Sequence, residues 1–365
     1  MPETARASAL EQYFSPDYAT ARNRFRTAAN RAHAECHALA LRARGPLGEA
    51  LSIDIAWLGN REPRRLLLHT SGLHGVEAYA GAAIQLALLE SPPQLGSTDA
   101  VVLVHVLNPY GMAWLRRTNE NNVDLNRNFL AGTDEWAGAH PLYREIAKFL
   151  NPASKPRADA FLVRAAGYAL RSGFHPIKQA IAEGQYEFPR GLFYGGKHLE
   201  EGPRLYLAWL TEHCGSVQRL LALDVHTGLG RHGHDTLFVE SGDGVSYTVL
   251  ERALGRPVID AARAQSDGYT IRGSLGSAMY RVFADASTHS LLQEFGTYGP
   301  LRVLHALREE NRCHFYGGAA LSHRAKQRLR ETLCPQSPAW RRQIIHQGVA
   351  VAHTLSRWLF RKESS

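Results

Sequence analysis

Three short apolar runs, each ending in polar residues, constrain the fold of this chain most strongly. They are residues 66–70 (LLLHT), 101–107 (VVLVHVL) and 220–226 (LLALDVH). Continuous apolar runs of this length are typical of strands buried on both faces of a parallel sheet. Between the first two runs, residues 77–90 are rich in alanine and leucine and predict a helix. The pattern predicts an α/β fold with a mixed, mostly parallel central sheet and helices on both faces.

The remaining segments predict further elements around this sheet. Residues 51–57 alternate large apolar with smaller or polar side chains, which predicts another strand. The other expected elements are strands over 236–240 and 290–295, a helix over 17–43, and helices over 301–360 that break near Gly317-Gly318 and Pro335. Residues 130–215 are long and mixed, and they predict an inserted, mostly helical segment. We therefore expect one domain over residues 1–365, with an N-terminal helical segment over about 1–45.

The composition is that of a folded globular protein, with 44% hydrophobic and 21% charged residues in a chain of 365. This balance excludes a mainly disordered, collagenous or coiled-coil protein. No apolar run reaches the roughly 20 residues of a membrane-spanning helix. The first 26 residues lack the apolar core of a signal peptide, so we expect a cytoplasmic protein without a membrane partner. The four cysteines contain no CxxC pair, which favours reduced thiols over disulfides.

The formal net charge of +8 raises the question of nucleic-acid binding. The basic residues are scattered along the chain, however, and the densest run, residues 323–330, contains no aromatic side chain. This run predicts a solvated helix face, and we expect no nucleic-acid partner. An excess of arginine also suits small anionic substrates.

Polar residues that could take part in catalysis or ligand binding lie where the predicted strands end. His74 follows the first apolar run, Asn108 follows the second, His226 ends the third, and Glu294 lies near the end of the 290–295 strand. Because the carboxyl ends of parallel strands meet at one edge of a sheet, we expect these side chains to converge there.

A zinc site is the sharpest hypothesis for this edge. His74 and Glu77 are three residues apart in SGLHGVE, where Gly72 and Gly75 permit a backbone turn. Imidazole and carboxylate are good zinc ligands, and His226 is the natural third ligand of a catalytic site with one open position. Taken alone, HxxE also fits a loop histidine and a glutamate favoured by a helix N-terminus. The ligand types would also permit cobalt or manganese.

Other histidines compete for this role. His232 and His234 follow His226 in a predicted loop and are candidate additional ligands. His69, His105 and His289 lie in or beside predicted strands and are expected to be structural.

The stretch 116–129 (RRTNENNVDLNRNF) is the densest polar segment of the chain. It is interpreted either as a surface loop or as a source of arginines that bind a carboxylate or an oxyanion. Glu294 lies among apolar neighbours, where burial would raise its pKa and suit a general base, although a salt-bridged glutamate is the simpler alternative. Residues 228–233 match the GxGxxG pattern, but a predicted strand follows where a dinucleotide site needs a helix.

Taken in order, these motifs resemble the zinc carboxypeptidase superfamily, which includes carboxypeptidase A and the aspartoacylase and succinylglutamate desuccinylase deacylases. The resemblance covers roughly residues 50–300. It rests on His74-x-x-Glu77, Asn108-Pro-x-Gly111, Val123-Asp-Leu-Asn-Arg-Asn-Phe129, His226 and Glu294. The Gly-Val inside HxxE and the long segment after Phe129 resemble a bacterial cytosolic branch more than the secreted digestive enzymes.

The resemblance implies a role for each matching residue. One Zn²⁺ per chain would be held by His74, Glu77 and His226, with Asp124 bonded to the outer nitrogen of His74. Arg117 would polarise the scissile carbonyl, and Arg116 is the alternative for this substrate contact. The remaining implied roles are a terminal-carboxylate clamp (Asn126 and Arg127), a general base (Glu294) and a mobile tyrosine (Tyr269, or else Tyr280).

Two enzyme hypotheses and one non-enzyme hypothesis follow. The first is a carboxypeptidase-like hydrolase that cleaves an amide next to a terminal carboxylate. The second is a deacylase of small N-acyl amino acids, which would use the same site. The third is a non-catalytic zinc-binding protein. In the first two cases the partner is a small peptide or N-acyl amino acid with a free carboxylate.

Overall fold

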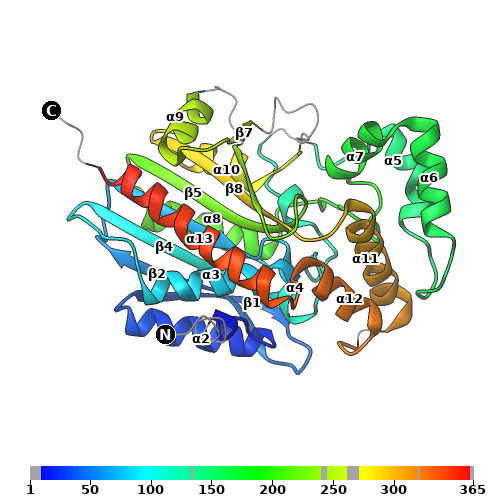
Figure 1. Ribbon diagram of the computed structural model, residues 1–365, viewed down its shortest axis with the longest axis horizontal. Coiled ribbons are helices and arrows are strands. Elements are labelled where there is room, and N and C mark those ends of the chain that lie inside the picture. The colour runs from blue at the N-terminus through cyan, green and yellow to red at the C-terminus, as the bar shows by residue number, and fades with distance from the viewer. Residues whose placement is uncertain (1–9, 133–134, 240–244, 261–270, 319, 362–365) are drawn as a thin grey trace.

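The computed structural model describes residues 10–132, 135–239, 245–260, 271–318 and 320–361 (Figure 1). In these residues eight strands form one sheet with the order β1-β2-β4-β3-β5-β8-β6-β7. The strands are β1 Glu35–Arg44, β2 Ala50–Gly59, β3 Arg65–Ser71, β4 Asp99–His105, β5 Arg219–Gly228, β6 Asp235–Val239, β7 Ile259–Asp260 and β8 Ser287–Gly296.

The centre of the sheet is parallel and its flanks are mixed. Strands β4, β3, β5 and β8 are parallel neighbours, whereas β1, β2 and β6 pair antiparallel with β2, β4 and β8, respectively. The central strands are almost wholly buried, as expected of apolar runs covered on both faces. The predicted fold class, a mixed and mostly parallel α/β sheet, is confirmed.

Helices cover both faces of the sheet (Figure 1). On one face lie α2 (Tyr18–Arg31), α3 (Ala78–Glu90) and α13 (Pro338–Leu359), and on the other lie α8 (Glu201–His213) and α10 (Leu275–Val282). Helix α3 is buried nearly all round because its alanine-rich surface packs against the sheet and both neighbouring helices. Gly348 of α13 permits this close packing, since a Cβ atom there would lie 2.6 Å from Ile84 Cδ1.

The helix predicted over 17–43 is wrong in its second half. Helix α2 ends at Arg31, His33 adopts a left-handed φ of 53°, and Glu35–Arg44 forms the edge strand β1. Alanine, leucine and arginine favour helices locally, but pairing with β2 overrides that preference. Each predicted strand has a counterpart in the structure, namely those at 51–57, 66–70, 101–107, 220–226, 236–240 and 290–295. Val106 and Leu107 lie beyond β4, and residue 240 lies outside the described residues.

The segment predicted as an insertion contains four helices with two different roles. Helix α8 packs on the sheet, whereas α5 (Pro141–Leu150), α6 (Phe161–Ser172) and α7 (Phe174–Ala182) form a hydrophobic cluster of their own. Figure 1 shows these three helices at one end of the molecule, next to α11 (Pro300–Arg312) and α12 (Arg324–Leu333). The remaining helices are α4 (Pro109–Ala113), α9 (Val245–Leu254) and the short segments Gly75–Glu77, Leu125–Arg127 and Cys313–Gly317.

The basic run at 323–330 is not entirely a solvated face. Lys326 on α12 is fully buried, and its ammonium group donates to Glu310 Oε1 at 2.9 Å. Among the described residues, no helix is both long enough and apolar enough to span a membrane.

Candidate metal centre

The site forms where the order of the parallel strands reverses. Strand β3 lies between β4 and β5, so a crevice opens between the carboxyl ends of β3 and β5. His74 follows β3 at this point, and His226 lies on β5. Gly72 and Gly75 adopt positive φ angles in the turn, and a Cβ atom at Gly75 would lie 2.4 Å from the carbonyl oxygen of Arg116. The turn that carries His74 therefore requires these glycines.

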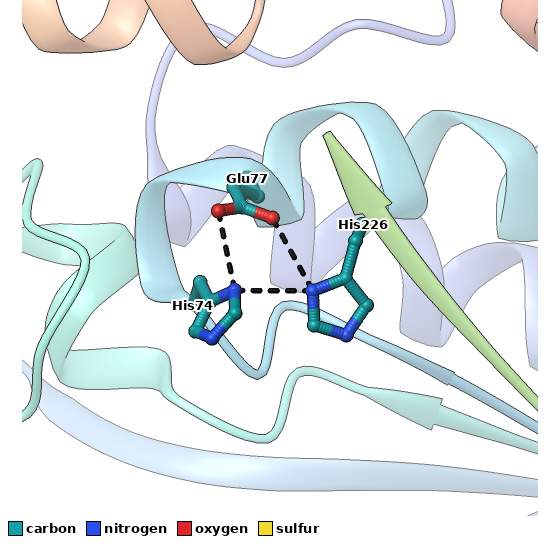
Figure 2. A group of neighbouring side chains, drawn as sticks. All are labelled: His74, Glu77 and His226. Atoms are coloured by element: carbon teal, nitrogen blue, oxygen red, sulfur yellow. Dashed lines mark hydrogen bonds and ion pairs between the residues drawn. The ribbon is translucent and has the colours of Figure 1, made fainter. Parts of the chain in front are cut away.

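Three buried side chains converge in this crevice (Figure 2). His74 Nδ1 lies 3.2 Å from Glu77 Oε1 and 3.0 Å from His226 Nδ1. His226 Nδ1 lies 3.6 Å from Glu77 Oε2. The structure thus brings together the three residues that the sequence analysis selected as metal ligands.

Both imidazole rings are oriented by a carboxylate on their outer nitrogen. His74 Nε2 lies 3.1 Å from Asp124 Oδ1, and His226 Nε2 lies 2.6 Å from Asp224 Oδ2. Thr70 in turn donates to Asp224 Oδ1 at 2.6 Å. A proton held on Nε2 of His226 would leave its Nδ1 lone pair facing His74 and Glu77, which is the arrangement of a metal-ligating histidine.

The distances in this group fit a tetrahedral zinc ion. Bonds of about 2.0–2.1 Å place neighbouring tetrahedral ligands about 3.3 Å apart, and the observed separations are 3.0–3.6 Å. The electrostatics agree. Burial would lower the pKa of His226, yet Asp224 and Glu77 hold it well above its ordinary value. Burial would raise the pKa of Glu77, yet His74, His226 and Arg117 hold it well below its usual range. The group therefore attracts positive charge.

Arg117 lies against the metal group. Its Nη1 donates to Glu77 Oε1 at 3.0 Å, its Nε donates to Asp124 Oδ2 at 2.9 Å, and its Nη2 is 2.7 Å from His74 Nε2. Its guanidinium group also lies over the Phe193 ring, 5.3 Å from the centroid. A fixed cation in this position can stabilise negative charge that develops beside the metal.

Asn126 and Arg127 lie in the short helical segment that follows Asp124. Asn126 Oδ1 accepts from the backbone N–H of Leu275 at 3.0 Å. Arg127 is 1% exposed, its Nη1 donates to the carbonyl oxygen of Asn126 at 2.8 Å, and its Nε has no hydrogen-bond partner. A buried donor without a partner is costly unless a ligand satisfies it.

Glu294 reaches the same cavity from β8. Its Oε1 accepts from the backbone N–H of Leu229 at 2.9 Å. Burial, and secondarily the charge of Glu77, raises the pKa of Glu294 to about 7. A carboxyl group with this pKa can both accept and return a proton at neutral pH.

One cavity of about 170 Å³ joins these parts. Its lining includes His74, Glu77, His226, Arg117, Asn126, Arg127 and Glu294.

Arg116 does not join this group. Its side chain is fully buried elsewhere, where Nε donates to Glu310 Oε1 at 3.0 Å and Nη2 donates to Asn122 Oδ1 at 2.8 Å. The expectation that Arg116 contacts substrate is therefore wrong, because the Glu310 carboxylate on α11 binds this guanidinium and directs it away from the cavity.

The remaining sequence-based candidates have other places. Tyr269 lies outside the described residues. Tyr280 lies on α10, where its hydroxyl accepts from the backbone N–H of Ser290 at 3.4 Å, and it does not line the cavity. His232 contacts the carbonyl oxygen of Thr297, and neither His232 nor His234 joins the metal group.

Asp224 was not among the site residues predicted from the sequence. Residues two apart on a strand point to the same face, so Asp224-x-His226 already places a carboxylate beside the imidazole.

Several solved structures have folds similar to that of this chain. Bovine thrombin-activatable fibrinolysis inhibitor, solved in complex with tick carboxypeptidase inhibitor, matches with a TM-score of 0.52 and 11% identity over 96% of this chain and 98% of that one. Carboxypeptidase A from Helicoverpa armigera matches with a TM-score of 0.43 and 14% identity, over 92% of this chain and 73% of that one. Murein-tripeptide amidase from Escherichia coli O157 matches with a TM-score of 0.38 and 19% identity, over 76% of this chain and 92% of that one. The chain has the carboxypeptidase-like α/β fold, as the sequence motifs predicted.

A family model assigns the chain further. The model described as "Protein of unknown function (DUF2817)" matches residues 14–347, and the chain belongs to this family. No curated protein sequence is significantly similar to the chain.

Proposed function

We propose that this protein is a zinc-dependent hydrolase that cleaves an amide bond next to a terminal carboxylate. One observation carries the proposal. A three-ligand group with the spacing of a zinc site shares a cavity with Arg117, the buried Arg127 and a glutamate whose pKa is about 7. A zinc ion bound by His74, Glu77 and His226 would supply Lewis acidity, which lowers the pKa of water towards about 7 and polarises a carbonyl oxygen.

The arginines would bind and orient the substrate. Arg127 is buried with an unpaired Nε, and together with Asn126 it would bind the terminal carboxylate. Arg117 would stabilise the negative charge that develops on the oxygen of the scissile carbonyl. A clamp for a terminal carboxylate makes the enzyme exo-acting.

Glu294 would move the proton. Its carboxylate accepts a proton from the attacking water and passes it to the nitrogen of the leaving amine, so that the proton balance closes within one turnover. The backbone N–H of Leu229 holds the carboxyl group in place for both steps.

The same site supports a deacylase of N-acyl amino acids, because both substrate classes end in a carboxylate. A non-catalytic zinc-binding protein would not need a base beside the metal group, which favours the enzyme. The proposed partner is a small substrate, with no role for nucleic acid or membrane, and the proposed location is the cytoplasm.

The test is hydrolysis of a mixed library of short peptides and N-acyl amino acids by the zinc-loaded protein, read by mass spectrometry. Glu294→Gln is the blank. Loss of single C-terminal residues from peptides would support the carboxypeptidase, and cleavage confined to N-acyl amino acids would support the deacylase. Stoichiometric zinc without cleavage of any substrate would contradict the proposed enzyme.

A further inference from the structure

The cavity at the metal group continues into a pocket with apolar walls, built by α5, α6, α7 and α11. We call this part the acyl pocket. The side chains that these four helices contribute are apolar except for Tyr168 and Lys178. Its walls include Phe149 on α5, Ala169 on α6, Ile177 and Ile181 on α7, and Leu304 and Leu307 on α11.

Buried contacts hold the two walls of the acyl pocket together. Arg308 on α11 is fully buried, and its Nε donates to the carbonyl oxygen of Phe149 on α5 at 2.7 Å. Its guanidinium group lies 5.5 Å from the ring centroids of both Phe149 and Phe161, and it pairs with Asp159. These hydrogen bonds, ring contacts and the ion pair of Arg308 join the inserted helices to α11. The position of the two walls, and so the pocket between them, is therefore fixed by the fold.

Exposed apolar side chains gather on the same helices. Of the six large hydrophobic side chains that are exposed among the described residues, five lie on α6, α7 or α11, namely Leu162, Val163, Leu170, Phe174 and Leu301. Phe174 and Leu301 also line the cavity itself. Isolated exposed apolar residues are ordinary, but a concentration around a pocket marks a site for an apolar ligand.

This inference rests on the proposed function, in which the terminal carboxylate of the substrate binds at Asn126 and Arg127 and the scissile carbonyl lies at the metal group. Asn126 also borders a second, smaller cavity of about 20 Å³, lined by Leu275 and Met279 of α10, which touches none of the metal group. If the carboxylate binds at Asn126 and Arg127 and the carbonyl lies at the metal group, the cavity of about 20 Å³ beyond Asn126 leaves little room there. We therefore assign the larger apolar part of the main cavity to the acyl side of the substrate. Peptide backbone placed there would find few polar partners along the walls, whereas a hydrocarbon chain needs none.

We propose that the acyl pocket receives a long apolar acyl chain, so that the substrate is an amphiphilic N-acyl amino acid. Each methylene group that leaves water for the pocket should raise kcat/KM about fourfold until the pocket is filled.

The experiment uses the zinc-loaded protein and N-acyl-alanines from acetyl to dodecanoyl, together with the dipeptide phenylalanyl-alanine. Direct binding of decanoate is measured by calorimetry, with acetate as the reference. We expect kcat/KM to rise with chain length and decanoate to bind where acetate does not. A flat chain-length series would overturn the proposal, and so would a preference for phenylalanyl-alanine without such a rise, because the pocket would then serve a peptide side chain.

Two tryptophan variants on α6 form a matched pair. Ala169 lines the acyl pocket, whereas Ala166 on the same helix is exposed and does not. Ala169→Trp should fill the pocket, lowering both decanoate affinity and kcat/KM for decanoyl-alanine by about tenfold or more while sparing acetyl-alanine. Ala166→Trp should behave as wild type, and circular dichroism checks that both variants fold. Equal effects of the two variants would overturn the proposal.

The binding measurement separates this inference from the proposed function. Decanoate binding that Ala169→Trp weakens, without hydrolysis of any amide, would contradict the hydrolase while supporting the pocket. Hydrolysis of acetylated substrates without decanoate binding would support the hydrolase and overturn the pocket.

Discussion

Glu294 and His226 are paired in register on the neighbouring parallel strands β8 and β5. Residues paired in this way project to the same face of a sheet, so the proposed base and a metal ligand enter the cavity side by side. Glu77 acts on the charge of both groups, and their other neighbours differ. Asp224 contacts His226 at 2.6 Å, whereas Glu294 is buried and accepts from the backbone N–H of Leu229. One ladder of the sheet therefore fixes the separation between metal ligand and proton carrier.

Replacing Glu294 by glutamine should abolish turnover while sparing the metal. The amide has nearly the same shape but cannot accept the proton, so we expect kcat to fall by roughly 10²–10⁴-fold. Zinc content, measured by atomic emission, should stay at the wild-type level because Glu294 is not a ligand. Retention of most of the activity would show that another group carries the proton.

Replacing Asp224 by asparagine should weaken zinc binding. The carboxylate orients His226 and raises its basicity, and loss of such a partner typically reduces metal affinity by about 10–100-fold. Competition with a chromophoric chelator measures the affinity. Thr70→Val removes only the hydrogen bond to Asp224 Oδ1 and should give a smaller loss in the same direction. Unchanged affinity in Asp224→Asn would contradict the assigned role.

Removing the metal should lower thermal stability. A ligand that binds the folded state alone stabilises it by RT ln(1 + [L]/Kd), which is about 4 kcal/mol at a thousandfold excess over Kd. We expect a chelator to lower Tm and added zinc to restore it. His226→Gln should be insensitive to both treatments, and a wild-type Tm that ignores zinc would count against the metal site.

The three residues of the metal group could be predicted because short sequence patterns identify them. The spacing of His74 and Glu77 and the position of His226 at the end of an apolar run needed only the assumption that parallel strands end at one edge. Arg116 and Arg117 show the limit of this reasoning. They are adjacent and chemically identical, and what separates them is Glu310, which lies 194 residues beyond Arg116 in the chain and captures its side chain.

The fold shows the same contrast between local and distant causes. The buried central strands were visible as apolar runs, whereas β1 was read as helix because its edge position leaves only one face half-buried. The division of residues 130–215 into a sheet-covering α8 and a pocket-building α5–α7 depends on tertiary packing, which has no local pattern.

The buried charges around Glu310 should be essential for stability. Arg116 and Lys326 are both fully buried and both bind this carboxylate. Burial would raise the pKa of Glu310, yet these two cations hold it below its usual value. Glu310→Gln would leave two cations without their anion, and we expect a loss of about 3–5 kcal/mol in the free energy of unfolding. Urea titration measures it, and the exposed Glu62→Gln, as a control, should change it by less than about 0.5 kcal/mol.

The buried imidazole of His105 should make the protein less stable in mild acid. His105 stacks on Phe25 with 4.5 Å between ring centroids, and neither ring nitrogen has a hydrogen-bond partner. Burial, assisted by the charge of Arg22, lowers its pKa to about 3. Because the ordinary pKa is about 6.5, the unfolded chain binds a proton between these values that the folded protein does not.

The sign of the effect follows from this difference. Stability is fully present above pH 6.5 and is lost as the pH falls, at about 1.4 kcal/mol per pH unit for this one group. His105→Phe keeps the aromatic contact and removes the titration. Between pH 7 and pH 5, its free energy of unfolding should therefore fall about 2 kcal/mol less than that of wild type. Urea titrations of both proteins at the two pH values measure this, and both keep the same metal site, so the difference isolates His105. Equal losses in the two proteins would mean that this imidazole gains a proton without unfolding.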